Sequence, residues 1–210
     1  MRGPRGSVLP GVDVGHGKTF AVLIHQTDGD GLCGFWPFAD WLATEHGVHA
    51  LLFDLCDFGR ARCRDAEFSS NQQAQVALAV EWARDHGARR VVLVGASMGG
   101  ALALSTAAVT PVDAVVDLSG PPTWPGAVAH QAASKITIPV LIATSPGDPY
   151  ADYDQIHAAF REITARPKRF IKGSGAHGWG LLSGFSASPN RVPWLPLATT
   201  VAHWIIGQKS

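Results

Sequence analysis

Residues 90–104 read RVVLVGASMGGALAL, and this stretch decides the fold prediction for the chain. Its first part, residues 90–94, is one arginine followed by four apolar, mostly β-branched residues, typical of a strand that is buried on both faces. From residue 98 to about residue 109 the chain is rich in Ala and Leu and favours a helix. Between strand and helix stands Gly95-Ala96-Ser97-Met98-Gly99, a G-x-S-x-G motif in the context where it carries chemistry.

The motif predicts a nucleophilic serine. A strand that turns directly into a helix holds the residue at the turn above the sheet, and the flanking glycines remove β-carbons that would clash. The backbone N–H of Met98 would then face an oxyanion, helped by the helix dipole. The alternative is a glycine-rich turn of a nucleotide-binding fold. The spacing of the glycines around Ser97 lacks the G-x-G-x-x-G pattern and the Gly-Lys-Ser/Thr of the P-loop, so we favour Ser97 as nucleophile.

Outward from this motif, short apolar runs alternate with helical patterns, as in β-α-β units with a mostly parallel sheet. We predict one α/β domain over residues 1–210, with a central sheet of about six to seven strands flanked by helices. Strands are expected at 20–25, 48–54, 90–94, 114–118, 140–144 and 168–172. Helices are expected at 35–46, 71–86, 98–109, 152–163 and from about 193 to 206. Candidate caps are a Ser or Asn at 69–71, and Gly47, Gly87 and Gly207 stand where helices should stop.

Composition excludes several classes. The chain is 46% hydrophobic and 16% charged, as in a globular protein, and its 17 basic residues balance 17 acidic ones, which disfavours nucleic-acid binding. No apolar run reaches the length of a membrane span, and residues 1–10 lack the apolar run of a signal peptide, so we expect no membrane association and a cytoplasmic location. An odd number of cysteines argues against a disulfide scaffold. The absence of H-E-x-x-H and C-x-x-C spacing predicts no metal site.

The run VVLVGASMGGALAL resembles the nucleophile elbow of the α/β-hydrolase superfamily. The order of elements from about residue 19 to residue 206 is similar as well, most of all to the small, lidless serine hydrolases called dienelactone-hydrolase-like or carboxylesterase-like. The resemblance implies a triad in the chain order Ser, acid, His. Because Phe20 comes so early, the first strands of the family sheet are expected to be shortened. The roughly twenty residues between the strands at 114–118 and 140–144 are too few for a helical lid.

His177 is the predicted base among nine histidines. It follows the last expected strand, lies between Gly175 and Gly178, and fits the family's chain order. His25 ends the first strand, where it resembles the His of the family's oxyanion loop, and we expect it to be a buried scaffold residue. The other seven are expected at surfaces, at interfaces or in loops without matching context.

Asp148 is the predicted acid that orients the base. It follows the strand at 140–144 in the turn Ser-Pro-Gly-Asp, where the family's acid usually lies. Asp117, at the end of the preceding strand, is a known alternative placement in the fold, and Asp152 and Asp154 are nearby substitutes. An ordinary turn aspartate is the alternative reading of Asp148.

The second oxyanion donor should be a backbone N–H just after the first strand. The family's His-Gly is replaced here by His25-Gln26 followed by Thr27. This departure leaves both Gln26 and Thr27 as candidates, and we favour Thr27.

Several residues near the expected catalytic edge could line a substrate pocket or simply pack in the core. They are Cys33, Phe35, Trp36, Trp124 and Trp179. Cys33 could in principle be a nucleophile, but nothing in the sequence activates it.

The resulting hypothesis is a hydrolase of carboxylic esters or thioesters that acts on a small acyl substrate through an acyl-enzyme and needs no cofactor. An acyltransferase or perhydrolase would use the same acyl-enzyme with another acceptor. A non-catalytic small-molecule binder is the third reading, disfavoured because all three triad candidates are present. The sequence does not indicate an oligomeric state.

Overall fold

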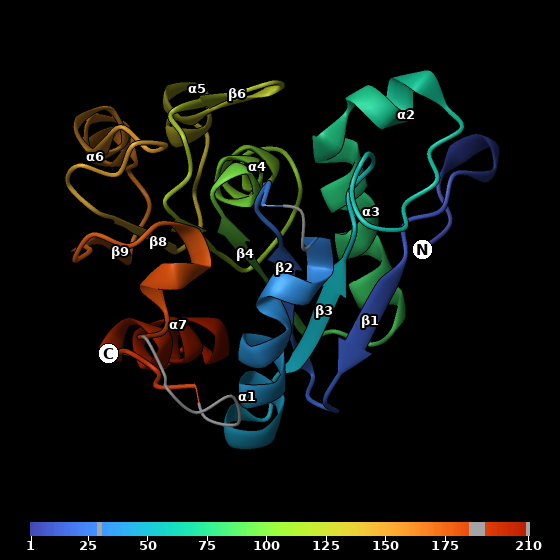
Figure 1. The fold of residues 1–210 in the computed structure, drawn as a ribbon, viewed down its shortest axis with the longest axis horizontal. Helices are drawn as coiled ribbons and strands as arrows, with labels where there is room; N and C mark the ends of the chain where they lie inside the picture. Colours follow the sequence, from blue (N-terminus) through green and yellow to red (C-terminus); the bar gives the residue numbers. More distant parts are fainter. Residues whose placement is uncertain (29–30, 185–191, 209–210) are drawn as a thin grey trace.

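The central sheet has seven strands in the order β1-β3-β2-β4-β5-β8-β9 (Figure 1). The structure, a computed structural model, describes residues 1–28, 31–184 and 192–208. All neighbouring strands are parallel except β1, which pairs antiparallel with β3 at the edge. The strands are β1 Gly11–Val14, β2 Thr19–Ile24, β3 His49–Phe53, β4 Arg90–Ala96, β5 Ala114–Leu118, β8 Val140–Thr144 and β9 Lys168–Lys172. The predicted α/β fold class is confirmed.

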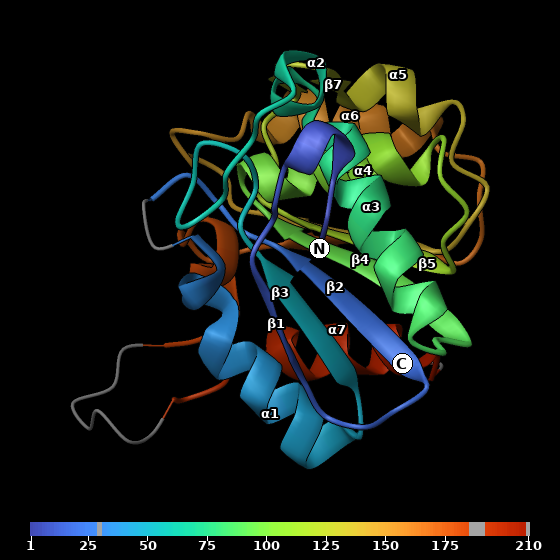
Figure 2. The same ribbon diagram turned by 90° about the vertical axis from the view of Figure 1, so that its right-hand side faces the viewer.

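Helices cover both faces of the sheet (Figure 2). Two of them, α1 and α7, pack on one face, and α3, α4, α5 and α6 pack on the other. The α-helices are α1 Trp36–His46, α2 Ala66–Ser70, α3 Gln72–Asp85, α4 Met98–Ala107, α5 Ala129–Ala133, α6 Tyr153–Glu162 and α7 Pro196–Ile206. Three short 3-10 helices are η1 Pro4–Gly6, η2 Gly31–Phe35 and η3 Gly178–Leu181.

The central strands are largely apolar because each of their faces meets a layer of helices. In β2, Phe20, Val22 and Ile24 enter the core beneath α3 and α4. Ala21 and Leu23 enter the core beneath α1 and α7. Alternate side chains of a strand point to opposite faces, so a strand inside a covered sheet is apolar on both faces, with Asp117 of β5 as an exception.

Helix ends follow the expected signals with one exception. The Asn71 side chain accepts the Ala74 N–H at the start of α3, and Gly87 beyond its end has φ +88°. The C-terminal helix begins at Pro196 and not near Pro193 as predicted. Trp194 instead forms an antiparallel bridge with Ser183, which holds this stretch extended. Pro196 then starts the helix, since its fixed φ suits a first turn.

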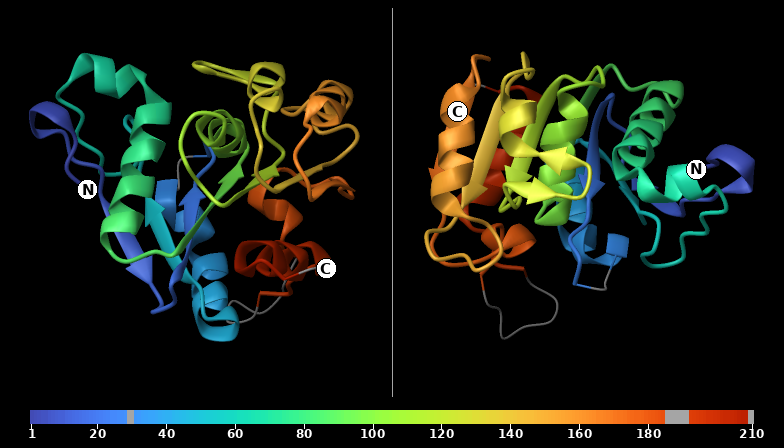
Figure 3. Two further views of the ribbon diagram at one scale, coloured as in Figure 1. Left: turned by 180° about the vertical axis from the view of Figure 1, so that it is seen from behind. Right: turned by 90° about the horizontal axis from the view of Figure 1, so that it is seen from above.

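The expected shortening at the N-terminal side is seen, because only the four-residue β1 precedes β2 in the sheet. Between β5 and β8 lie a hairpin of β6 Thr123–Trp124 and β7 Ala127–Val128, followed by α5. The hairpin stands beside α5 on the same side of the sheet as α4 (Figure 3). None of the described helices is long and apolar enough to cross a membrane.

The cysteine prediction is wrong in one respect, since Cys56 and Cys63 form a disulfide with a Cα–Cα distance of 5.8 Å. The chain after β3 folds back through two successive turns, in which Phe58 N–H donates to the Leu55 carbonyl and Ala61 N–H to the Phe58 carbonyl. This local reversal brings together two cysteines seven residues apart. Cysteine number alone does not reveal such a turn. Cys33 is free and exposed.

Candidate active site

Ser97 stands alone between β4 and α4, in a conformation that serine rarely adopts. Its φ is 52° and its ψ is −121°. A β-carbon on Gly95 would overlap the Gly99 carbonyl oxygen, and one on Gly99 would overlap the Ile24 carbonyl oxygen. Both glycines are therefore required for the close approach of α4 to β4 and β2, and this approach fixes the strained turn at Ser97.

The strained turn places Ser97 at the N-terminus of α4. Ser97 is 8% exposed, and its hydroxyl forms no hydrogen bond with the described residues. Met98 is the first helical residue, so the helix offers no carbonyl for its N–H, and no other described group accepts it. A free N–H beside a hydroxyl at a helix N-terminus is an arrangement that can hold a developing negative charge.

His177 and Asp148 are in direct contact. The Nδ1 of His177 lies 2.7 Å from Asp148 Oδ2, and the Asp148 side chain is fully buried while that of His177 is 21% exposed. The other carboxylate oxygen of Asp148 accepts the N–H groups of Tyr150 at 3.0 Å and Ala151 at 3.3 Å. The carboxylate is thus locked by its own turn, while the Nε2 of the imidazole is left without a partner among the described residues.

The loop that carries His177 also lies against the turn at Ser97. A β-carbon on Gly178 would come 3.5 Å from that of Ala96 and would overlap Gln26 Oε1. Gln26 Oε1 also accepts the Trp179 N–H at 3.3 Å. Three segments that are distant in sequence therefore meet at one edge of the sheet, namely the ends of β2 and β4 and the loop after β9.

His25 is a buried scaffold residue, as predicted. The Leu55 N–H donates to its Nε2 at 3.1 Å, so Nδ1 carries the proton and donates to the Gln26 carbonyl at 2.8 Å. Burial lowers the pKa of His25 and keeps the ring neutral. These bonds fix the start of the loop that contains Gln26 and Thr27. Thr27 is exposed, and the Gln26 side chain donates to Asp28 at 2.9 Å.

The alternative acids lie elsewhere. Asp117 is fully buried beneath α4, where its Oδ1 accepts the Gly120 N–H at 2.7 Å and lies against Gly100. Burial raises its pKa to about 7. Asp152 caps α6 by accepting the Gln155 N–H, and Asp154 lies in the first turn of that helix. Of the four aspartates considered, only Asp148 contacts His177.

The predicted pocket residues separate into three groups. Phe35 is buried, and Trp179 packs edge-on against it with ring centroids 5.4 Å apart. Both line an apolar cavity of about 120 Å³ that Phe38 and Trp194 complete. Trp36 is 43% exposed and Cys33 is exposed, and neither lines the cavity beside Trp179.

Trp124 belongs to a different contact. Its Nε1 donates to Gln72 Oε1 at 2.8 Å, and the Gln72 amide donates to Met98 Sδ at 3.7 Å. Trp124 is thus connected through Gln72 to Met98, the residue that follows Ser97. Sequence reasoning missed Gln72, which carries no local signal beyond its place in the first turn of α3.

Tyr150 is a second residue that sequence reasoning missed. Its ring lies 4.9 Å from the His177 ring, although the tyrosine is 69% exposed. It also borders a cavity of about 560 Å³ between residues 121–123 and 147–154. Its position two residues after Asp148, beyond a proline, is the signal that could have identified it. The described residues contain no group of three or more His, Cys, Asp or Glu placed to hold a metal ion.

Solved structures with the same fold come from several organisms. A monoacylglycerol lipase of Paleococcus ferrophilus matches with a TM-score of 0.73 and 14% identity over 96% of this chain and 100% of the lipase. The Pyrococcus furiosus esterase Pf2001 matches with a TM-score of 0.75 and 12% identity over 97% and 92% of the two chains. An enol-lactonase of Burkholderia xenovorans matches with a TM-score of 0.70 and 14% identity over 97% and 96%. These identities establish the fold alone.

No curated protein sequence matches the chain. The family model described as "Dienelactone hydrolase family" matches residues 58–171, more than half of the 210 residues. The matched segment includes Ser97 and Asp148, and His177 lies six residues beyond its end. The chain belongs to the dienelactone hydrolase family and is an α/β-hydrolase.

Proposed function

We propose that this enzyme hydrolyses carboxylic esters or thioesters of small acyl groups through an acyl-enzyme on Ser97. The proposal is carried by the 2.7 Å distance between His177 Nδ1 and Asp148 Oδ2. The loop that contains His177 packs against the turn at Ser97. The three residues that we assign as nucleophile, base and acid share one edge of the sheet, where ligands bind in α/β folds, and this supports the proposal.

In the first half of the reaction, Ser97 Oγ attacks the acyl carbon and its proton passes to His177 Nε2. The N–H of Met98 and a second N–H from Gln26 or Thr27, with Thr27 preferred, stabilise the oxyanion. When the tetrahedral adduct collapses, the bond to the leaving alcohol or thiol breaks, and His177 returns the proton to it. Throughout, Asp148 accepts the Nδ1–H of His177 and stabilises the imidazolium.

In the second half, water attacks the acyl-enzyme while His177 takes one of its protons. The Ser97 ester bond then breaks, the proton returns to Oγ, and the carboxylic acid leaves. The chemistry requires no group beyond these side chains and the backbone.

The cavity beside Trp179 suggests the size of the acyl group. Its volume of about 120 Å³ and its lining of Phe35, Phe38 and Trp194 suit a short apolar chain. We therefore expect p-nitrophenyl acetate and butyrate to be turned over faster than the decanoate.

The decisive experiment combines turnover of p-nitrophenyl butyrate with labelling by a fluorophosphonate probe and peptide mass spectrometry. In wild type the adduct should lie on Ser97. Ser97→Ala should lower kcat on the order of 10⁶-fold, and Asp148→Asn, which disturbs the imidazole tautomer, about 10⁴-fold. His177→Ala should nearly abolish labelling. His130→Ala, at a surface histidine paired with Glu162, is the matched control and should react like wild type. Turnover that survives in Ser97→Ala would refute the proposal.

A further inference from the structure

A further cavity lies toward the other end of α4 from Ser97. It has a volume of about 160 Å³, is partly open to solvent, and is lined by residues of α3, α4, α5, the β6–β7 hairpin and the segment after α5. Ser105, on its wall, is eight residues along the helix from Ser97, about 12 Å at the rise of an α-helix. The lining residues are Gln73, Ser105, Ala108, Val109, Gly126, Val128, Gln131, Ala132 and Lys135.

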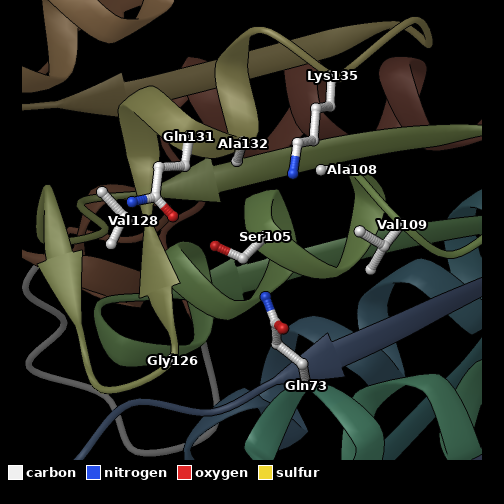
Figure 4. A pocket seen from close by; sticks show the side chains of 9 residues that line it. All are labelled: Gln73, Ser105, Ala108, Val109, Gly126, Val128, Gln131, Ala132 and Lys135. Carbon is white, nitrogen blue, oxygen red and sulfur yellow. The ribbon is translucent and has the colours of Figure 1, made fainter.

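Four polar side chains converge on this cavity from separate segments. Figure 4 shows Gln73 from α3, Ser105 from α4, Gln131 from α5 and Lys135 beyond α5 directed toward the shared space. None of these four side chains forms a hydrogen bond or ion pair with another described residue. The cavity therefore presents four polar groups that the described fold leaves uncommitted.

Among the four side chains, the Ser105 hydroxyl gives the strongest evidence for a binding site. It is only 5% exposed, and its Oγ is buried without a partner among the described residues. A serine inside a helix usually donates to a carbonyl one turn back, and Ser105 does not. Since buried polar groups are nearly always hydrogen-bonded, the Ser105 hydroxyl is available to a group that enters the cavity.

The charge of the cavity favours an anion. Lys135 is the one charged residue in its lining, and its ammonium is not neutralised by any described acid. An adjoining cavity of about 230 Å³, lined by residues 107–112, 135, 137 and 138, shares Lys135 and also lacks an acidic residue. The lining thus offers one ammonium group, two carboxamides and one hydroxyl. These groups suit a ligand group with a single negative charge that can accept several hydrogen bonds.

The rest of the lining is apolar and small. Val109 is 67% exposed at the border between the two cavities, and Ala108, Val128 and Ala132 complete this side. We propose that the cavity binds a small aliphatic carboxylate, with the carboxylate group on Lys135, Gln73, Gln131 and Ser105 and the alkyl chain against Val109 and Val128. This site is separate from the edge that carries Ser97, and the proposal does not depend on the reaction proposed there.

The test is a titration with butyrate followed by backbone ¹H–¹⁵N NMR, with butyramide as its uncharged isostere. Butyrate should shift the resonances of residues 73, 105, 126–135 and 109, and butyramide should bind about tenfold more weakly. Lys135→Gln should weaken butyrate binding by about tenfold, and Ser105→Ala by a few fold. Lys18→Gln, at an exposed lysine that directly precedes β2 and lines neither cavity, is the matched control and should bind like wild type.

Three outcomes would overturn the proposal. Equal binding of butyrate and butyramide would show that charge plays no part. Shifts confined to residues 95–99 and 177–179 would place the carboxylate at the catalytic edge instead. Tighter binding of inorganic phosphate than of butyrate would identify a site for a different class of anion. Because all readouts are of binding, they are independent of whether Ser97 forms an acyl-enzyme.

Discussion

The backbone of Ser97 has a conformation that is sterically unfavourable for any residue with a β-carbon. With φ 52° and ψ −121°, the residue lies in a region where a β-carbon meets its own backbone. Such a residue costs on the order of 1–3 kcal/mol, and the surrounding packing of Gly95 and Gly99 must hold it. The strained turn places the hydroxyl at the N-terminus of α4.

This strain predicts an unusual order of stability at position 97. Ser97→Gly removes the β-carbon, whereas Ser97→Ala keeps it. The free energy of unfolding should therefore be about 1 kcal/mol higher for the glycine variant than for the alanine variant. Urea denaturation followed by circular dichroism measures the difference.

Ser69 in α2 provides the control, because in a helix alanine should be the more stable of the two by about 1 kcal/mol. If alanine were also the more stable residue at position 97, the strain in the structure would not exist in solution.

At the scale of elements, the site depends on loops that touch one another. Gly178 opens η3 with φ 56°, and its Cα faces both Ala96 and the Gln26 side chain. The disulfide-closed loop after β3 lies at the same edge, since Leu55 holds His25 and Phe58 packs on the His25 ring. In the loop-entropy model, closing a loop of this size contributes about 2.5 kcal/mol to stability. Each loop is thus tied to its neighbour.

A methyl group at Gly178 should therefore displace the His177 loop. A displacement of about 1 Å lowers catalytic rates on the order of 100-fold, so Gly178→Ala should reduce kcat for p-nitrophenyl butyrate by 10- to 100-fold. Gly180→Ala is the matched control. A β-carbon there meets only Ala176 Cβ at 3.6 Å, and kcat should stay near wild type. Equal kcat values for both variants would contradict the described packing.

At the scale of the whole molecule, one buried carboxyl links global stability to pH. Asp117 has a pKa raised to about 7 because it is buried beneath α4, against 3.8 for the free side chain. A folded state that binds the proton more tightly than the unfolded state is stabilised at low pH. This contribution is complete below the unfolded pKa and is lost as the pH rises through the folded pKa.

Between pH 5 and pH 8, wild type should therefore lose about 3 kcal/mol of unfolding free energy relative to Asp117→Asn. The asparagine keeps an oxygen for the Gly120 N–H and does not ionise. Urea unfolding of both proteins at both pH values measures the effect. The contribution of His25 to the pH dependence cancels in the comparison, because both proteins contain this histidine. Parallel pH profiles would show that Asp117 ionises in the folded state as it does when unfolded.

The sequence by itself determined the fold class and the turn at Ser97. The apolar run of β4, the two glycines and the helix-forming residues of α4 are neighbours in the chain, and local sterics are sufficient to specify a strand, a tight turn and a helix. Asn71 and Gly87 likewise indicated the ends of α3, because caps act within a few residues. The position of Asp148 after a strand made it a candidate acid, but only one of four.

The tertiary structure decided what depends on long-range contact. It determined that β3 lies outside β2, that Asp148 rather than Asp117 reaches His177, and that Gln26 meets the loop of Trp179 across 153 positions. It also paired Cys56 with Cys63 and left Ser105 facing a cavity. Local periodicity shows which face of an element is apolar, whereas strand order and loop contacts arise from how the whole sheet packs its helices.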